Sequence, residues 1–310
     1  MTRVGVITNP DQALHVAPGH PERPDRVRAI LDRLHADERL RELAWLEPGE
    51  ASRDLPLLVH TPAEVDDVEA TAAQGGGWFD ADTYCTRDSY GVALSAARCA
   101  VDATDAVMRG DFAAVFSVAR PPGHHATGSR PMGFCLFNNA AIVVSHAMQQ
   151  GAARVAVIDI DVHHGNGTQD IFWDEPSVLY TSVHQYPWYP GTGDRTETGG
   201  RHAPATTVNV PVPAGTDGER WLELFDERIV PAVDAFAPAL IVVSAGYDAH
   251  VADPLAELRL TVDTYAEIAR RVRRLAESHA DGRSVWLLEG GYDLTAISDS
   301  VAACLRVLSA

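Results

Sequence analysis

Short apolar runs alternate with longer helix-like stretches along this chain of 310 residues, and the alternation restricts the fold more than any other feature. Several runs are continuous in Val, Ile and Leu, which is typical of strands that are covered on both faces. Eight strands are predicted, over residues 3–7, 55–59, 113–118, 154–158, 178–183, 207–212, 240–243 and 284–288. Strands that alternate with helices predict a mostly parallel sheet with crossover connections.

Helices are predicted between many of these strands, over residues 26–43, 90–108, 138–149, 221–236, 262–278 and 294–308. A closed (β/α)₈ barrel would also contain eight strands, but long irregular segments separate the first three runs. We therefore favour an open α/β sheet with helices on both faces. Because no repeat, low-complexity tract or linker interrupts the pattern, residues 1–310 are predicted to form a single domain.

The formal net charge of −18 argues against a general nucleic-acid-binding protein, which would need a basic face. The acidity either favours cationic substrates or serves solubility alone. No CxxC pair occurs, so reduced thiols in a cytoplasmic protein are predicted for Cys85, Cys99, Cys135 and Cys304. No apolar run reaches about 18 residues and the first residues lack a signal-peptide core, so no membrane partner is expected.

Three side chains of metal-binding type follow the predicted strand 154–158. Asp159, Asp161 and His163 alternate, so an extended chain would place them on one side. The carboxyl end of such a strand faces the crevice where α/β sheets bind ligands. One Asp here would usually cap the next helix, but three such groups are costly to bury without a cation or other partners. The segment therefore predicts a divalent metal site.

A further ligand should come from the end of another strand. The run 240–243 leads to Asp248 and His250, and both side chains are candidates. With Asp161 and His163, Asp248 would complete an O/N/O set with positions free for water and substrate, as a catalytic metal requires. We favour Asp248 as the ligand and place His250 at the edge of the site.

Two adjacent histidines, His124 and His125, follow the predicted strand 113–118. In a loop both rings can line a pocket, and histidine titrates near neutrality, so the pair predicts a general base and a general acid. A carboxylate or amide behind each ring would set its tautomer and basicity, and Asp159 and Asn166 are candidate partners. The alternative is a pair of surface histidines without a catalytic role.

The strand 284–288 leads into Glu289, Gly290, Gly291 and Tyr292. Two glycines allow the backbone to turn tightly and to approach a ligand. The phenol of Tyr292 would then donate a hydrogen bond to an oxyanion. The alternative is a tyrosine that only packs, with its hydroxyl group bonded elsewhere.

Taken together, these segments resemble the histone deacetylase superfamily, and within it the bacterial class II-like deacetylases and their acetylpolyamine amidohydrolase relatives. The matching motifs lie in order over nearly the whole chain: HPERPDR at 20–26, RPPGHHA at 120–126, GFCLFNNAAI at 133–142, DIDVHHGNGTQDIF at 159–172, YTSVH at 180–184, PGTGD at 190–194, SAGYDAH at 244–250, DPL at 253–255 and EGGYDL at 289–294. Nine motifs in order are a specific signal. Asn166 stands where class I-type enzymes carry Asp, which fits the class II-like branch.

The resemblance implies an arginase/deacetylase fold with an eight-stranded parallel sheet, and it implies roles for individual residues. One catalytic Zn²⁺ would be bound by Asp161, His163 and Asp248. The catalytic residues would be His124, His125, Tyr292, Asp159 and Asn166. The residues that contact the substrate would be Asp82, Gly133, Phe134, Tyr189, Gly290 and Arg26, with Asp82 at the rim and Arg26 in an inner cavity. A structural K⁺ would involve Asp159, Asp161, His163, Ser182 and Val183.

The predicted function is zinc-dependent hydrolysis of acetyl-lysine, or short acyl-lysine, side chains in proteins or peptides by metal-activated water. Hydrolysis of acetylated polyamines is the alternative substrate choice. Two rivals are a non-catalytic acyl-lysine binding protein and an arginase-like binuclear Mn²⁺ hydrolase, which would need a second Asp close after Asp248. Homo-oligomers are compatible with the sequence.

Overall fold

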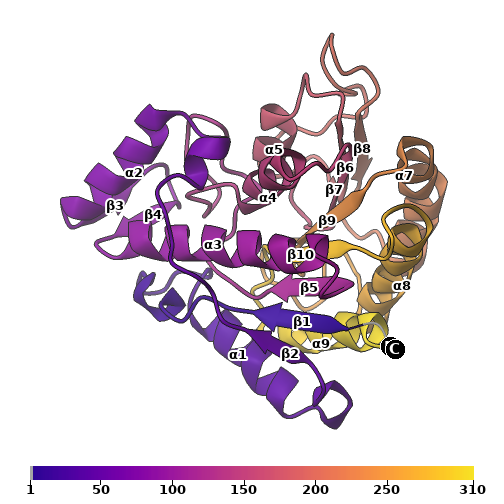
Figure 1. The fold of residues 1–310 in the computed structure, drawn as a ribbon, viewed down its shortest axis with the longest axis horizontal. Coiled ribbons are helices and arrows are strands. Elements are labelled where there is room, and N and C mark those ends of the chain that lie inside the picture. The colour runs from indigo at the N-terminus through magenta and orange to yellow at the C-terminus, as the bar shows by residue number, and fades with distance from the viewer. Residues whose placement is uncertain (1–2) are drawn as a thin grey trace.

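An open sheet of eight parallel strands runs through the centre of the computed structural model, which describes residues 3–310 (Figure 1). The strands are β1 (Val4–Ile7), β2 (Ala44–Leu46), β5 (Ala114–Ser117), β6 (Val155–Asp159), β7 (Val178–Gln185), β8 (Thr207–Val212), β9 (Leu240–Ala245) and β10 (Ser284–Leu288). Their order across the sheet is β2-β1-β5-β10-β9-β6-β7-β8, and every neighbouring pair is parallel. Because β2 and β8 are edges, the sheet is open and the barrel alternative is excluded.

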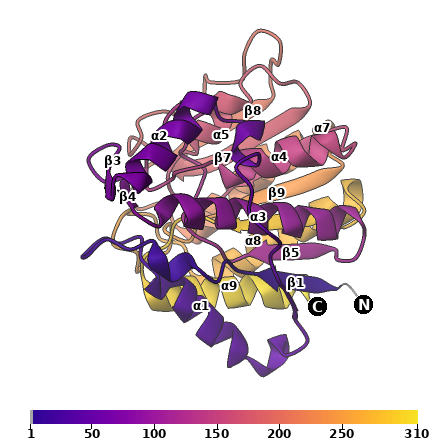
Figure 2. The ribbon, with the colours of Figure 1, turned by 60° about the vertical axis from the view of Figure 1, so that its left-hand side comes forward.

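Helices cover both faces of the sheet, as predicted (Figures 1 and 2). One face packs against α3 (Ser89–Met108) and α4 (Asn139–Gln149). The other face packs against α1 (Asp25–His35), α6 (Gly218–Leu224), the π-helical turn η4 (Phe225–Ile229), α7 (Val230–Phe236), α8 (Val262–His279) and α9 (Leu294–Leu308). Alternate residues of one strand reach opposite cores: in β10, Val285 packs under α3 and Trp286 packs on the other side.

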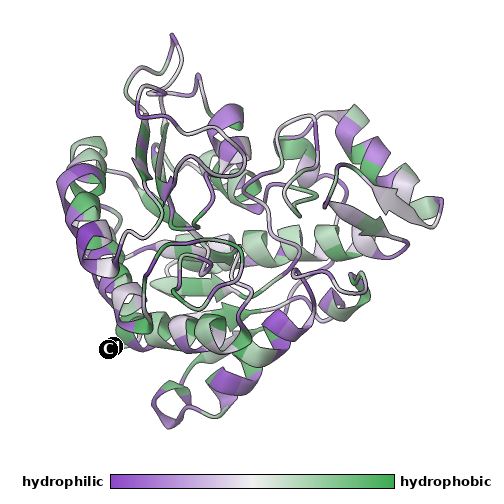
Figure 3. Cartoon of the chain, turned by 180° about the vertical axis from the view of Figure 1, so that it is seen from behind, coloured by the Kyte–Doolittle hydropathy of each residue, from purple (hydrophilic) through white to green (hydrophobic). Residues whose placement is uncertain are grey.

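Hydropathy follows this layering. In Figure 3 the central strands are mainly hydrophobic, whereas the covering helices mix hydrophobic and hydrophilic segments. The interior includes the fully buried rings of Trp221 and Trp286. Burial of the strands on both faces explains why their sequences read as continuous apolar runs rather than alternating ones.

The predicted strand 55–59 is wrong, and β2 takes its place. Residues Pro56–Leu58 form the 3₁₀ turn η3, with a proline that cannot donate to a sheet ladder. Its leucines pack with α2 (Pro62–Ala73), a helix that the sequence reading missed. Strand β2 is a three-residue edge strand whose Trp45 is 41% exposed, so it carries no continuous apolar signal.

Two predicted helices differ from the expectation, one in length and one in regularity. The predicted helix 26–43 ends at His35, because the chain then makes the 3₁₀ turn η2 (Glu38–Leu40) and enters β2. The predicted helix 221–236 is interrupted by the π-helical turn. Further short elements are α5 (Asn166–Ile171), the turn η1 (Gln12–Leu14) and a two-stranded antiparallel hairpin of β3 (Gly76–Trp78) and β4 (Tyr84–Thr86).

The sheet order brings the chemistry-bearing motifs together. Strands β5, β10, β9 and β6 are consecutive neighbours, and each is followed by one of the four polar motifs. All four strands are parallel, so these motifs meet at the same edge of the sheet. In Figure 1 this edge faces the side on which α2 and the β3–β4 hairpin lie.

Within residues 3–310, no helix is both long enough and apolar enough to cross a membrane. The four cysteines are free and buried in this range. Buried thiols of this kind pack as small apolar side chains.

Glu64 on α2 is a buried carboxyl group outside the predicted site. It lies 3.9 Å from Nδ1 of His60, whose Nε2 accepts a hydrogen bond from the backbone N–H of Asn138. Neither carboxyl oxygen of Glu64 has a hydrogen-bond partner among the described residues. Burial, with a contribution from Asp67, raises the pKa of Glu64 from 4.5 to about 8.

This shift predicts a pH-dependent stability. The folded state retains a proton on Glu64 that the unfolded chain releases near its ordinary pKa, so stability falls as pH rises from 4.5 toward 8. We expect Glu64→Gln to remove part of that loss, on the order of 2 kcal/mol at the alkaline end. Urea unfolding of wild type and variant at both ends of this window measures the effect. Glu42→Gln, which changes an exposed side chain, is the control. If the free energy of unfolding depends on pH equally in wild type and Glu64→Gln, the account is contradicted.

Candidate active site

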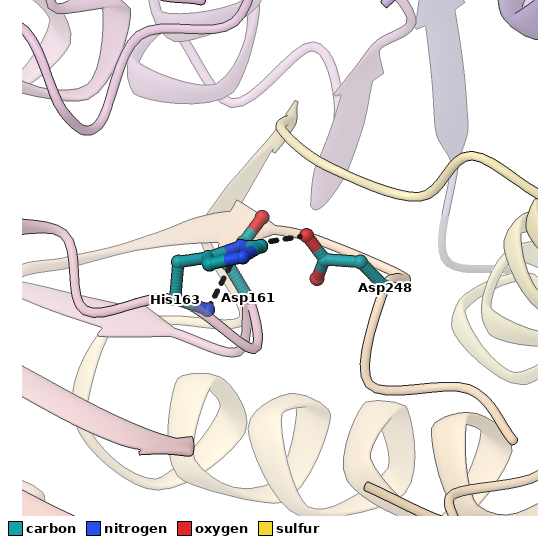
Figure 4. Close-up of side chains that lie close together, drawn as sticks. All are labelled: Asp161, His163 and Asp248. Carbon is teal, nitrogen blue, oxygen red and sulfur yellow. Dashed lines mark hydrogen bonds and ion pairs between the residues drawn. The ribbon is translucent and has the colours of Figure 1, made fainter. Parts of the chain in front are cut away.

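Three buried side chains form the candidate metal centre (Figure 4). Asp161 and His163 follow β6, and Asp248 follows β9, the neighbouring strand. Nδ1 of His163 lies 3.1 Å from Oδ1 of Asp161 and 3.1 Å from Oδ2 of Asp248. One ligand atom from each residue lies within 4.8 Å of the others. The structure therefore brings together the three predicted ligands, and His250 is not part of this group.

Backbone donors hold the two carboxylates in place. Asp161 accepts hydrogen bonds from the N–H groups of His163 (2.9 Å) and Gly290 (2.8 Å), and Asp248 accepts one from Val162 (2.9 Å). A Cβ atom on Gly290 would overlap the carboxylates of both Asp248 and Asp161. Glycine is required at this position because the backbone approaches the carboxylates so closely.

The electrostatics of this group favour a bound cation. Burial lowers the pKa of His163, but the carboxylates of Asp161 and Asp248 offset this and raise it to about 10. The ring would thus hold a proton where a cation would otherwise lie. Tetrahedral Zn²⁺ with bonds of about 2.0–2.1 Å separates its ligand atoms by roughly 3.4 Å, close to the 3.1 Å between Nδ1 of His163 and each carboxylate oxygen. The O/N/O set and its geometry fit one Zn²⁺.

Each of the two adjacent histidines has its own partner. Nδ1 of His124 lies 3.0 Å from Oδ2 of Asp159, and Nδ1 of His125 lies 2.8 Å from Oδ1 of Asn166. The ring centroids are 4.0 Å apart, and both rings are buried. Asp159 also accepts a hydrogen bond from the hydroxyl group of Tyr180. The loop thus holds both rings side by side, each oriented from behind.

The different partners of the two histidines shift their pKa values in opposite directions. Burial lowers the pKa of His124, but the carboxylates of Asp159 and Asp161 raise it to about 10. Burial together with the neighbouring His124 and His163 lowers the pKa of His125 well below its ordinary value. His125 is therefore neutral near pH 7, and its Nε2 is free to accept a proton while Nδ1 donates to Asn166.

A cavity of about 250 Å³ opens onto this centre. It is lined by Asp82, Pro122, His124, His125, Gly133, Phe134, His163, Trp188, Tyr189, Leu255, Gly290 and Tyr292. The histidines lie at its buried inner end, whereas Asp82, Trp188 and Tyr189 are exposed and mark its entrance. Nine of the twelve lining residues belong to the predicted site set.

Tyr292 is held against the cavity from two sides. Its N–H donates to Asp253 (2.6 Å), and its ring meets the edge of Phe134 at a centroid distance of 5.9 Å. The guanidinium group of Arg26 lies 5.0 Å from the ring on another side. Burial raises the pKa of Tyr292 well above its ordinary value although Arg26 lowers it, so the phenol keeps its proton.

Comparison with known proteins gives this site a family. Residues 20–308 match the family described as "Histone deacetylase domain". The chain belongs to the histone deacetylase family. A "Probable deacetylase" of Archaeoglobus fulgidus is 41% identical over 94% of this chain and 81% of its own length. The "Histone deacetylase-like amidohydrolase" of Pseudomonas aeruginosa is 38% identical over 89% of this chain and 73% of its own length.

The fold agrees with this membership. The structure titled "Crystal Structure of HDA15 HD domain" superposes on this chain with a TM-score of 0.94 at 35% sequence identity. The superposition covers 99% of this chain and 88% of that chain. "Histone deacetylase 14, chloroplastic" of Arabidopsis thaliana is 40% identical over 95% of this chain and 74% of its own length. The family and the arginase/deacetylase fold predicted from the motifs are therefore confirmed.

Arg26 lies against the segment 289–291 and outside the cavity lining. Its fully buried guanidinium group donates to the carbonyl groups of Gly291 (2.6 Å) and Glu289, and to Glu22 (3.0 Å). These bonds support the backbone on either side of Gly290. The inner-cavity role that the histone deacetylase resemblance implies for Arg26 stays a prediction.

The predicted potassium residues lie on two neighbouring strands or directly after one of them. Asp159 of β6 is in register with Ser182 of β7, and Val183 follows it. The hydroxyl group of Ser182 lies 2.9 Å from Nδ1 of His184. The segments named for potassium are thus adjacent, and K⁺ binding stays a prediction.

Several residues that shape the site were not predicted from the sequence. Leu255, Trp188 and Pro122 line the cavity, and their loops carry no periodic signal. Asp253 accepts hydrogen bonds from the N–H groups of Tyr292 and Leu255. Glu289 accepts two more from the backbone at residues 123 and 124, which ties the histidine loop to β10. The DPL and EGGYDL motifs contained both acids, but spacing alone does not show that an acid accepts from backbone donors.

Proposed function

We propose that this protein is a metal-dependent deacetylase that hydrolyses the amide of acetyl-lysine side chains. The single observation that carries the proposal is the cavity of about 250 Å³ that leads from an aromatic entrance to His163, the two histidines and Tyr292. Ligands for one metal ion, a neutral base and a protonated phenol meet at its inner end. This is the set of groups that hydrolysis of an unactivated amide requires.

The metal would be one Zn²⁺ held by Asp161, His163 and Asp248, because their spacing and charge fit it. When bound, it would polarise the acyl carbonyl and acidify a water molecule. One ion rather than two is proposed because the described residues contain a single group of three such ligands. Asp253, the next acid after Asp248, is engaged with backbone donors instead.

The chain's own groups would move the proton and hold the oxyanion. Nε2 of neutral His125 would accept the proton of the attacking water and later donate it to the leaving amine. His124, kept cationic by Asp159, would favour the negative charge that develops on the substrate oxygen. Tyr292 would donate a hydrogen bond to the same oxygen.

Lysine is favoured over a polyamine by the cavity walls. The lining between entrance and inner end is largely aromatic or apolar, with Phe134, Tyr189 and Leu255, which suits the methylene stem of an acyl-lysine. Asp82 is the single carboxylate in the lining, whereas a polyamine carries further cationic amines. Acetylated polyamines are therefore the second substrate choice.

Parallel hydrolysis assays test the proposal. The Zn²⁺-loaded protein is expected to release acetate from an acetyl-lysine peptide with a higher kcat/KM than from N-acetylputrescine or N-acetylspermidine. The chain itself contains no lysine, so acetyl-lysine lost in a protein-substrate assay comes only from the added substrate. A higher kcat/KM for the polyamines would replace the proposed substrate, and binding without turnover would favour a non-catalytic acyl-lysine receptor.

The Tyr292→Phe exchange removes only the phenolic O–H. We expect kcat to fall by about 10²–10³ with little change in KM, because the lost hydrogen bond acts in the transition state. Steady-state kinetics on one acetyl-lysine peptide measure both constants. Tyr90→Phe, on α3 and outside the cavity lining, is the control. An unchanged kcat would remove Tyr292 from the chemistry.

The Asn166→Asp exchange tests His125 as the base. A carboxylate at 2.8 Å from Nδ1 would favour the protonated ring and raise the pKa of His125 above its present low value. A base works only when deprotonated, so the acid limb of the kcat/KM profile should move to higher pH. Profiles of wild type and variant measured with one peptide give the shift. An identical acid limb in both would argue that another group titrates.

A further inference from the structure

The β3–β4 hairpin holds an exposed indole beside the cavity entrance. Trp78 is 60% exposed, more than any other large hydrophobic residue among those described. Its ring lies 6.1 Å from that of Tyr84, its cross-strand partner, which is buried. An exposed indole offers its face to a cationic or planar group of a ligand.

The hairpin is attached directly to the cavity wall. Thr83 Oγ1 accepts a hydrogen bond from the N–H of Phe134 (3.1 Å), a lining residue. The ring of His20 lies between the two aromatic residues, 4.6 Å from Phe134 and 6.5 Å from Trp78. Nε2 of His20 also bonds the carbonyl group of Asp82 (3.0 Å). The position of Trp78 relative to the entrance is thus fixed.

Two carboxylates lie in the turn of the same hairpin. Asp80 accepts hydrogen bonds from the N–H groups of Asp82 (3.1 Å) and Thr83 (2.6 Å), and Asp82 lines the cavity. No arginine is paired with either acid within residues 3–310. Burial and the charge of Asp80 raise the pKa of Asp82. Burial and the charge of Asp80 also raise the pKa of Tyr189, a lining residue at the entrance, whereas the charge of Arg130 lowers it.

We propose that Trp78, Asp80 and Asp82 form a subsite for an arginine side chain that neighbours the acetyl-lysine of a protein substrate. This rests on the proposed deacetylase function. A planar guanidinium group stacks on an indole face and pairs with a carboxylate, and this subsite offers both. A glutamate at the same place would meet two like charges.

The spacing agrees with a neighbouring substrate residue. Asp82 both lines the cavity and belongs to the turn between β3 and β4, so a residue close to the acetyl-lysine would lie beside the hairpin while the lysine stem fills the cavity. The subsite therefore makes binding depend on the residues next to the acetylated lysine, whereas the cavity binds the acyl-lysine side chain itself.

A peptide series tests this subsite. Acetyl-lysine peptides carry Arg, Ala or Glu at each of the two positions before and after the modified lysine, and kcat/KM is measured for each with the Zn²⁺-loaded protein. We expect Arg to exceed Glu by about tenfold at one position or more, mainly through KM. Trp78→Ala and Asp80→Asn should each lower the ratio toward one. Trp45→Ala, an exposed tryptophan on the edge strand β2, is the matched control and should leave the ratio unchanged.

The outcomes distinguish failure of the arginine subsite from failure of the proposed deacetylase function. Turnover at equal rates with Arg, Ala and Glu would overturn the subsite and leave the deacetylase function standing. An Arg preference that survives Trp78→Ala and Asp80→Asn would also overturn it, because other residues would then create the preference. Absence of turnover with every peptide would contradict the proposed function and, with it, the subsite.

Discussion

Replacement of Asp248 by Asn is expected to weaken metal binding more than 100-fold and to reduce hydrolysis to the background rate. The exchange keeps the shape of the side chain, and its oxygen can still accept from the N–H of Val162. It removes the charge that faces Nδ1 of His163 at 3.1 Å, so one of the three ligands is lost. Mutating a residue that hydrogen-bonds to a metal ligand typically costs about 10- to 100-fold in metal affinity. Loss of a ligand itself should cost more, so we expect metal binding to weaken by more than about 100-fold.

Thermal unfolding with and without Zn²⁺ measures this effect independently of activity. Wild type should gain about 2.7 kcal/mol when free Zn²⁺ is about 100 times the dissociation constant, and the variant should gain far less. Glu64→Gln, which also removes a buried carboxyl group, is the control and should keep the metal response. An undiminished response in Asp248→Asn would refute the assigned ligand set.

The second large effect is expected for His125→Ala. Removing the proposed general base should lower kcat by about 10²–10⁴. Metal content should stay unchanged, because the ring contacts Asn166 and lies outside the ligand group. Neutrality near pH 7 distinguishes this ring from His124, whose partner is the charged Asp159.

Steady-state kinetics together with metal analysis separate the two roles. His146→Ala, a half-buried histidine paired with Asp105 on the α3–α4 face, is the control and should retain wild-type kcat. A loss below tenfold in His125→Ala would contradict its role as the base. A loss of metal in the same variant would show that the ring supports the ligands rather than the proton transfer.

Elements with strong periodicity were predicted closely from the sequence. Helix α9 occupies the predicted residues 294–308, and Asp293 caps it by accepting from the N–H of Ala296. Strand β10 occupies the predicted residues 284–288, because burial on both faces leaves an unbroken apolar run. Strand β2 was not predicted, because a short, half-exposed edge strand has neither an unbroken apolar run nor a regular periodicity.

The inner end of the site was predicted better than its entrance. Side chains of metal-ligand type follow strand ends, so alternation along residues 159–163 and the place of Asp248 after the predicted strand 240–243 were enough to propose Asp161, His163 and Asp248 as one group. Trp188 and Leu255 meet only in the folded chain, where the indole N–H of Trp188 donates to the carbonyl group of Leu255. Such contacts between loops depend on tertiary structure, and no local pattern encodes them.

Side chains that accept hydrogen bonds from backbone N–H groups also could not be recognised from the sequence. Asp253 and Glu289 hold the segments that carry Tyr292 and His124, yet neither is a metal ligand or a titrating partner of the histidines in the predicted set. Their role depends on where N–H groups point after folding. The sequence could place them in motifs without showing what they do.

Hydrolysis of an acetyl-lysine peptide by chelator-treated protein, before and after addition of one equivalent of Zn²⁺, tests the central claim most directly. We predict no release of acetate from the metal-free protein and recovery of turnover as the ligand group formed by Asp161, His163 and Asp248 is filled. Turnover that is unaffected by metal removal, or its absence in the Zn²⁺-loaded protein, would contradict the account.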